Sequence, residues 1–142
     1  MDAIVVDNMT VAAIRQSNIH GLGLFAICDI QKGFELCSLD GQLVGMNLID
    51  RTRYNLPCRH IQGHDHCTLL VEWNAVSDKK LLVRPYRTKY SYINHSRHPN
   101  LAVIALKVVA LTSIAENEEL TLDYRKEPLS DAYINGHGAT YL

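Results

Sequence analysis

The chain has 142 residues, of which 47% are apolar and 20% are charged, and its formal net charge is −1. This length predicts one domain spanning residues 1–142, and the apolar fraction excludes a disordered chain. The near-neutral charge argues against a general nucleic-acid binder, and no apolar run approaches the roughly 20 residues that cross a bilayer. The N-terminus has no basic and apolar leader, so we expect no secretion signal.

Short apolar segments separated by turn residues predict a mostly β fold. The expected strands cover residues 4–6, 11–14, 24–27, 34–39, 68–73, 81–83, 101–106, 108–114 and 120–124. The expected turns lie at residues 21–23, 31–33, 40–41, 77–78 and 84–85. Only residues 46–54 and 129–134 favour short helices.

The near-neutral total conceals an uneven distribution of charge. Residues 1–50 carry two basic and six acidic residues, and residues 51–97 carry nine basic and three acidic ones. Residues 98–142 carry three basic and six acidic residues. The middle of the chain is therefore basic and both flanks are acidic.

Cysteine and histidine concentrate in the segment from Cys58 to Cys67. Its ten residues include two cysteines and three histidines, which are types that bind zinc. Because the spacing matches no common zinc-finger pattern, a polar connecting loop is the main interpretation and a metal site is the alternative. The other cysteines, Cys28 and Cys37, lie in strand-like segments, where a free cysteine is commonly a small buried apolar residue.

Three motifs carry candidate chemistry. The first places Gly21 and Gly23 before an expected strand, where glycine allows a tight turn and a close approach of a ligand to the backbone. The second, Tyr90-Ser91-Tyr92-Ile93-Asn94-His95-Ser96-Arg97-His98-Pro99-Asn100, predicts a compact loop. The third, Glu119-Leu120-Thr121-Leu122-Asp123-Tyr124, alternates as a half-buried strand does. Each motif by itself is compatible with an ordinary turn, loop or strand.

Taken together and in this order, the motifs resemble the SET-domain protein-lysine methyltransferases over about residues 14–126. The resemblance implies a β-clip in which several small sheets and a few short helices surround a C-terminal pseudoknot. In that fold the Asn94-His95 segment meets the Tyr124 strand, although about 30 residues separate them, because one strand threads a loop formed by an earlier segment.

The resemblance also implies S-adenosylmethionine as the methyl donor, without a metal cofactor, and a lysine of a basic protein or peptide as the acceptor. Tyr124 matches the catalytic tyrosine of the family. The residues assigned to the donor pocket are Gly21, Leu22, Gly23, Asn94 and His95. Tyrosine can wall a channel for an amine and its alkyl stem. The candidates for that channel, with ordinary packing as the alternative, are Tyr54, Tyr90, Tyr92 and Tyr141.

The chain departs from zinc-binding members of the family, because Arg97 stands where many have cysteine and residues 125–142 contain none. We therefore expect a minimal SET domain without pre-SET or cysteine-rich post-SET elements. The tail at residues 127–142 or a second chain would close its substrate channel. The acidic residues around the Tyr124 strand predict docking of a Lys/Arg-rich tail, such as a histone tail.

Two other functions stay open. One is a catalytically weak SET-like module that binds basic peptides, and the other is a small metal-binding protein that uses the segment from Cys58 to Cys67. We expect a monomer or homodimer that contacts neither a membrane nor a specific nucleic-acid sequence. An intracellular methyl donor and free thiols indicate an intracellular protein, in the cytoplasm, the nucleus or a host nucleus.

Overall fold

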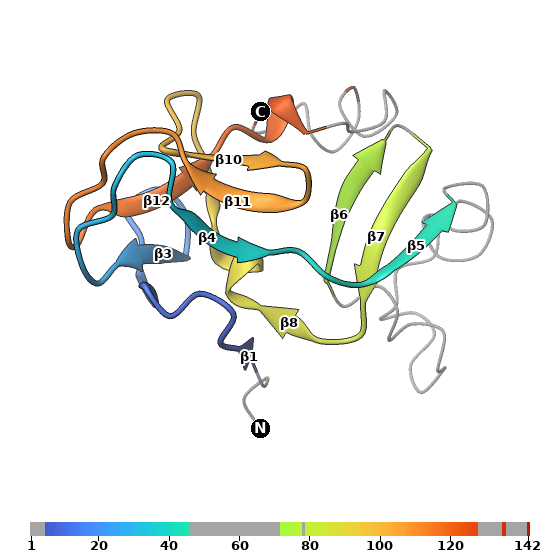
Figure 1. Ribbon diagram of the computed structural model, residues 1–142, viewed down its shortest axis with the longest axis horizontal. Coiled ribbons are helices and arrows are strands. Elements are labelled where there is room, and N and C mark those ends of the chain that lie inside the picture. The colour runs from blue at the N-terminus through green and yellow to red at the C-terminus, as the bar shows by residue number, and fades with distance from the viewer. Residues whose placement is uncertain (1–4, 46–71, 78, 128–134, 136–141) are drawn as a thin grey trace. The chain divides into compact units, whose positions relative to one another are not determined.

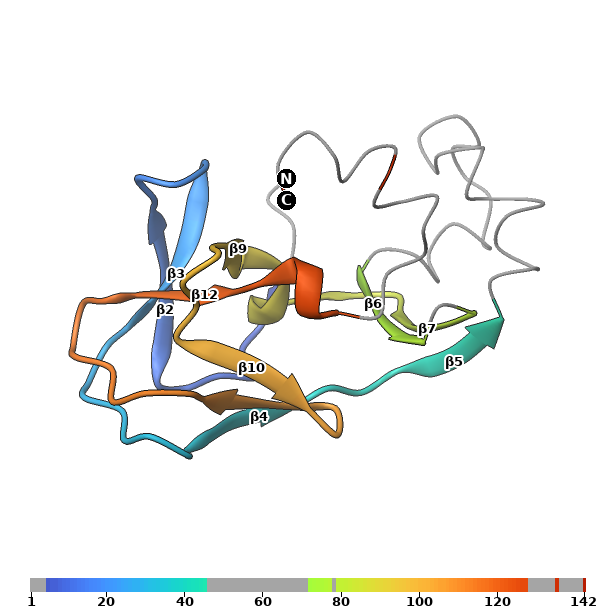
Figure 2. The same ribbon diagram turned by 90° about the horizontal axis from the view of Figure 1, so that it is seen from above.

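Figure 1 and Figure 2 show the computed structural model, which describes residues 5–45, 72–77, 79–127, 135 and 142. Short strands dominate the described part of the chain, as the alternation of apolar segments and turns predicts. The elements in chain order are β1 (Val5–Val6), β2 (Ala12–Gln16), β3 (Leu22–Ala26), β4 (Glu35–Ser38), β5 (Gln42–Gly45), β6 (Glu72–Ser77), β7 (Lys80–Arg84), β8 (Arg87–Thr88), 3₁₀ helix η4 (Lys89–Tyr92), β9 (Asn94–His95), β10 (Leu101–Ile104), β11 (Lys107–Ala110), β12 (Glu119–Leu122) and 3₁₀ helix η5 (Tyr124–Lys126).

The chain divides into two compact units. Unit 1 comprises Met1–Ile4, Asp40–Arg87 and Glu127–Leu142, and unit 2 comprises Val5–Leu39 and Thr88–Lys126. Among the described residues, unit 1 contains the sheet β5-β7-β6, and unit 2 contains the sheets β2-β3-β12-β9 and β10-β11-β4. The three sequence motifs all fall in unit 2. The expectation of one domain over residues 1–142 stays a prediction.

Strand β12 lies inside the four-stranded sheet of unit 2. It pairs antiparallel with β3, with Leu120 opposite Leu24, and parallel with β9, with Leu122 opposite His95. The Ser96 N–H extends the parallel contact by donating to the Leu122 carbonyl at 2.9 Å. A late strand is therefore held between an early segment and an intermediate one, as the pseudoknot implied by the resemblance requires.

Asn100 ties the loop after β9 onto the same strand. Its side-chain amide donates to the Glu119 carbonyl at 2.8 Å, and its side-chain oxygen accepts the Thr121 N–H at 2.9 Å. Because β9 has only two residues, this buried side chain satisfies backbone groups of β12 that the short strand does not reach.

The core of unit 2 collects apolar side chains from both of its sheets. Ile93 is 1% exposed, and its burial anchors the backbone immediately before β9. Burial of one such side chain contributes about 1.5–3 kcal/mol. Other nearly fully buried members are Met9, Leu24, Leu101, Val108, Ile114 and Leu120.

In unit 1, Arg84 is a buried charged residue with buried partners. Its Nε lies 2.5 Å from the Glu72 carboxylate, and its Nη1 donates to the Asp40 carbonyl at 2.7 Å and to the Asn74 side-chain oxygen at 3.1 Å. These bonds compensate for removing the guanidinium from water. Next to Asp40, a Cβ on Gly41 would lie 2.4 Å from the Val83 carbonyl oxygen, so the backbones approach too closely for a side chain.

Most of the predicted strands are confirmed with shifted ends, and two of the predicted turns need correction. Residues 40–41 form no turn, because the chain continues from β4 into β5, which the sequence reading missed. The 21–23 turn lies earlier, since the Ser17 N–H bonds to the Gly21 carbonyl and β3 already begins at Leu22. The 31–33 turn is confirmed by the bond from the Phe34 N–H to the Gln31 carbonyl. The prediction for residues 77–78 includes Asp78, which lies outside the described residues.

The strand predicted over residues 120–124 ends at Leu122, and Tyr124 begins η5 instead. The Asp123 carbonyl accepts the Lys126 N–H, and its carboxylate accepts the Arg125 N–H, so local bonds turn the chain here. The prediction that only one face of this strand is buried is also wrong. Thr121 and Asp123 are buried together with Leu120 and Leu122, because β9 and the loop carrying Asn100 cover this strand.

Several predictions fall on residues that the structure leaves undescribed. These are the helices at residues 46–54 and 129–134, the segment from Cys58 to Cys67, and most of the tail. Within the described part of the chain, no cluster of His, Cys, Asp or Glu could hold a metal ion, and no helix is long and apolar enough to cross a bilayer. The burial expected for Cys28 is wrong, since its side chain is exposed.

The β10–β11 hairpin predicts a stabilising substitution. Its two-residue turn puts Ala105 at φ 51° and Leu106 at φ 62°, a left-handed conformation that favours Asn or Gly. We expect Ala105→Asn to raise the free energy of unfolding by about 0.5–1 kcal/mol, because Ala105 is exposed and Asn tolerates this conformation. Urea denaturation measures the change. Ala105→Val should lower stability, and equal effects of the two variants would contradict the explanation.

Candidate active site

Segments far apart in the sequence meet around strand β12 in unit 2. Strands β2, β3, β12 and β9 pair in this order, and all four lie in the same region of Figure 2. The loop at residues 17–21 leads into β3, Asn94 and His95 form β9, and Tyr124 follows β12. The sheet thus brings together the three motifs that the sequence singles out.

The two glycines of the first motif have different surroundings. Gly21 adopts φ +46°, and a Cβ built there would meet no atom within 4 Å, so its surroundings are open. Gly23 is packed, because a Cβ there would lie 2.4 Å from the Glu119 carboxylate and 3.0 Å from Ser17 Cβ. Gly21 therefore leaves backbone accessible to a ligand, whereas Gly23 makes room for another part of the protein.

Asn94 joins the second motif to the first. Its side-chain amide donates to the backbone carbonyls of His20 at 3.1 Å and Leu22 at 3.3 Å. The amide also lies 3.0 Å from the Glu119 carboxylate. With acceptors on this side, the amide nitrogen must face the loop, which directs the side-chain oxygen away from it. The predicted donor-pocket residues Gly21, Leu22, Gly23 and Asn94 therefore lie together.

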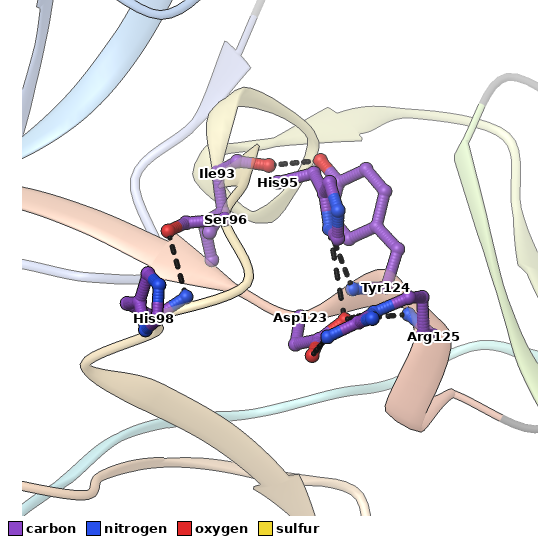
Figure 3. Close-up of polar contacts among 7 residues, drawn as sticks. All are labelled: Ile93, His95, Ser96, His98, Asp123, Tyr124 and Arg125. Atoms are coloured by element: carbon purple, nitrogen blue, oxygen red, sulfur yellow. Dashed lines mark hydrogen bonds and ion pairs between the residues drawn. The ribbon is translucent and has the colours of Figure 1, made fainter. Parts of the chain in front are cut away.

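The Tyr124 hydroxyl donates a hydrogen bond to the Ile93 carbonyl, as Figure 3 shows. Ile93 is buried immediately before Asn94, so the carbonyl is a fixed acceptor. The phenol proton is thus engaged, and the remaining lone pairs of the oxygen can accept bonds. The meeting of Tyr124 with the Asn94-His95 segment is confirmed.

His95 supports Tyr124 through its side chain. Its Nδ1 accepts the Tyr124 backbone N–H at 3.0 Å, and the two rings lie 5.2 Å apart. A nitrogen that accepts carries no proton, so the imidazole is neutral with its proton on Nε2. Burial lowers the pKa of His95 below 6.5, and Arg125 and Arg97 lower it further, while the Asp123 carboxylate and a bond with the Leu122 backbone oppose the shift.

Asp123 and Arg125 form a paired-charge contact beside this histidine. The Arg125 guanidinium donates to both carboxylate oxygens, from Nε at 2.9 Å and from Nη2 at 2.8 Å. The buried Asp123 lies 3.8 Å from His95 Nδ1. Hydrogen bonds from Arg125 hold the pKa of Asp123 at about 2, so the carboxylate stays charged at neutral pH.

Residues 21–125 match the family model described as SET domain. The chain belongs to the SET-domain family. Two curated relatives are both named histone-lysine N-methyltransferase trithorax, one from Drosophila virilis at 31% identity and one from Drosophila melanogaster at 30%. Each alignment extends over 127 residues and covers 84% of this chain but 3% of the relative, so the chain spans a small part of those proteins.

A solved structure shows the same architecture. The Neurospora SET domain protein DIM-5, described as a histone lysine methyltransferase, matches with a TM-score of 0.58 and 22% identity. The match covers 82% of this chain and 53% of that one. At this identity the likeness concerns the fold alone, and it confirms the mostly β SET-domain fold that the motifs predict.

The predicted lysine-channel residues of the SET domain divide into two groups. Tyr90 and Tyr92 are half-buried on η4, directly before the Ile93 carbonyl that binds Tyr124. Tyr54 and Tyr141 lie outside the described residues. The channel itself stays a prediction.

Two residues that the sequence reading assigned to no site also belong here. Glu119 and Ser17 contact each other and the Asn94 amide. A signal was present, because Glu119 opens the third motif and Ser17 precedes the glycine pair by four residues. Their contact joins residues 102 positions apart, however, which spacing in the chain does not reveal.

The acidic residues near Tyr124 mostly form ion pairs or hydrogen bonds with other residues of the SET domain. Asp123 pairs with Arg125, and the Glu118 carboxylate accepts the Asn100 amide at 2.9 Å. The acidic block of the sequence therefore does not translate directly into free carboxylates for docking a basic tail at this strand.

The neutral state of His95 predicts acid sensitivity. Because its folded pKa lies below 6.5, the unfolded chain binds this proton more readily. We expect the resulting stability to be complete above pH 6.5 and to decline as the pH falls through the folded pKa. Urea denaturation between pH 7.5 and pH 5 should show this slope, and His95→Gln should reduce it.

Exposed His98 supplies the matched control, since His98→Gln should keep the parent slope. Nitrogen-15 spectra at pH 7.5 should also show Nδ1 of His95 without a proton. A protonated Nδ1 would contradict the hydrogen bond from Tyr124.

Proposed function

We propose that this SET domain transfers a methyl group from S-adenosylmethionine to a lysine side chain of a protein. The observation that carries the proposal is the contact of Asn94 with the His20 and Leu22 carbonyls while the same segment holds the Tyr124 hydroxyl. The residues proposed for the donor site and Tyr124 are thereby held side by side. The names of the trithorax relatives support lysine as the acceptor.

The residues present fit the methyl donor. The open backbone at Gly21 and the exposed Leu22 leave room for a ligand beside β3. Asn94 directs its side-chain oxygen away from the loop, where it can accept a bond from the ammonium of an amino acid. Gly21, Leu22, Asn94 and the His95 backbone would hold this donor. When bound, S-adenosylmethionine supplies a methyl group activated by a positively charged sulfur.

Tyr124 would orient the acceptor amine. Its proton is donated to Ile93, so the phenol oxygen offers lone pairs to an amine or ammonium. This engagement argues against a general-base role, since an ordinary phenol with a pKa near 10 is rarely ionised at neutral pH. The contribution of the residue is positioning, which alone can supply several kcal/mol of a reaction barrier.

The acceptor must lose its proton before it can react, because a free lysine has a pKa near 10.4. A narrow apolar and aromatic channel favours the neutral amine by desolvation. Tyr90 and Tyr92 are the described candidates for its walls. The proposed substrate is a basic protein, such as a histone tail, and the proposed location is inside the cell.

The test is transfer of labelled methyl groups to purified histones and to a cell extract, combined with calorimetry of donor binding. The proposal expects labelled protein and donor binding by the same preparation. Binding of basic peptides without transfer would favour the alternative of a catalytically weak module. Absence of both donor binding and label would reject the enzyme.

Tyr124→Phe separates chemistry from binding. Removal of the hydroxyl should reduce transfer by about 100-fold or more, because it orients the reacting amine. Donor affinity should change by less than about threefold, and the stability lost with one hydrogen bond should be about 0.5–1.5 kcal/mol. Full activity of this variant would contradict the role of Tyr124.

A further inference from the structure

The Glu119 carboxylate lies at a junction between three segments of unit 2. Both of its oxygens are 2.8 Å from the Ser17 hydroxyl, and one is 3.0 Å from the Asn94 amide. Ser17 begins the loop before β3, Asn94 begins β9, and Glu119 begins β12. One side chain thus bonds the loop to the strand that carries the second motif.

Ser17 transmits this contact to the loop backbone. Its hydroxyl accepts the Ile19 N–H at 2.9 Å and the His20 N–H at 3.4 Å, and its own N–H donates to the Gly21 carbonyl at 2.8 Å. The loop is consequently folded around one oxygen. That oxygen is itself oriented by the Glu119 carboxylate, to which it gives its only proton.

Gly23 makes the arrangement sterically possible. The space that a Cβ would need is occupied by the Glu119 carboxylate at 2.4 Å. The absence of a side chain at Gly23 therefore makes room for the carboxylate. A larger residue at position 23 would displace it.

An ionised carboxylate suits this junction better than an amide. Ser17 and Asn94 both present hydrogen-bond donors, and a carboxylate accepts through both oxygens. A glutamine here would place one NH₂ group where an acceptor is needed. Hydrogen bonds to a charged acceptor are also roughly twice as strong as neutral ones.

We propose that Glu119 is a positioning residue that sets the donor site by clamping the Ser17–Gly21 loop to Asn94. This inference rests on the proposed function and assigns the control of donor affinity to a residue outside the donor contacts. Without the carboxylate, the Ser17 hydroxyl and the Asn94 amide lose the acceptor that they share, and the loop keeps only its direct bonds from the Asn94 amide. The backbone beside Gly21 and the Asn94 side-chain oxygen are then held less rigidly as one preformed surface.

Hydrogen exchange of the protein without ligand tests the clamp directly. In Glu119→Gln, the Ile19 and His20 amides should exchange about tenfold to 100-fold faster, as the loss of a charge-assisted bond predicts. Glu116→Gln is the matched control, because Glu116 lies in the same segment with an exposed side chain. Unchanged exchange in Glu119→Gln would overturn the clamp.

Calorimetry then tests its effect on the donor site. Glu119→Gln should bind S-adenosylmethionine about tenfold to 100-fold more weakly, while turnover at saturating donor falls by less than about threefold. Ser17→Ala should weaken binding similarly, and the double variant should be little worse than either single one. Additive losses or a fall in turnover with unchanged affinity would overturn the assignment.

The two readouts separate this inference from the proposed function. If the parent protein binds no donor but its loop exchanges faster in Glu119→Gln, the proposed function fails and the clamp stands without its donor role. If Glu119→Gln does not fold, Ser17→Ala provides the same comparison, because it removes the hydroxyl and keeps the carboxylate. Normal exchange and normal affinity in Ser17→Ala would overturn the proposal.

Discussion

The placement of β12 between β3 and β9 is the constraint on which the site depends. The strand bonds antiparallel to a segment about 95 residues earlier and parallel to one 27 residues earlier, and each pairing covers only two residue pairs. Such short pairings have little stability by themselves. Burial of Leu120 and Ile93 adds stability to these pairings, and so do the bonds from Asn100 to the β12 backbone.

Because β12 is short, its two ends connect both halves of the site. Glu119 begins the strand and contacts the loop before β3, and Tyr124 follows its other end and bonds to the Ile93 carbonyl. Asn94 and His95 lie opposite Thr121 and Leu122 of the same strand. Side chains from one strand pair thus hold the donor loop and the tyrosine at a fixed separation, which is what a positioning mechanism needs.

Local chemistry accounts for what the sequence predicts well. Apolar alternation and turn residues locate most strands, and the order of the three motifs identifies the family over residues 21–125. Errors occur where a long-range contact overrides a local preference. Thr121 and Asp123 alternate like surface residues but are buried, and Asp40-Gly41 resembles a turn but continues between strands beside Val83.

The sequence by itself determined the β-rich class, the SET-domain membership and the residue types of the site, because these follow from periodicity and motif order. Only the tertiary structure decided which partner each side chain has. It showed that the backbone at Gly21 is open, whereas the absence of a side chain at Gly23 makes room for Glu119. It also showed that the His95 side chain accepts a hydrogen bond from the Tyr124 backbone. The reason is physical: these contacts join residues that are from 29 to 102 positions apart, and folding brings them together through strand pairing that no local pattern encodes.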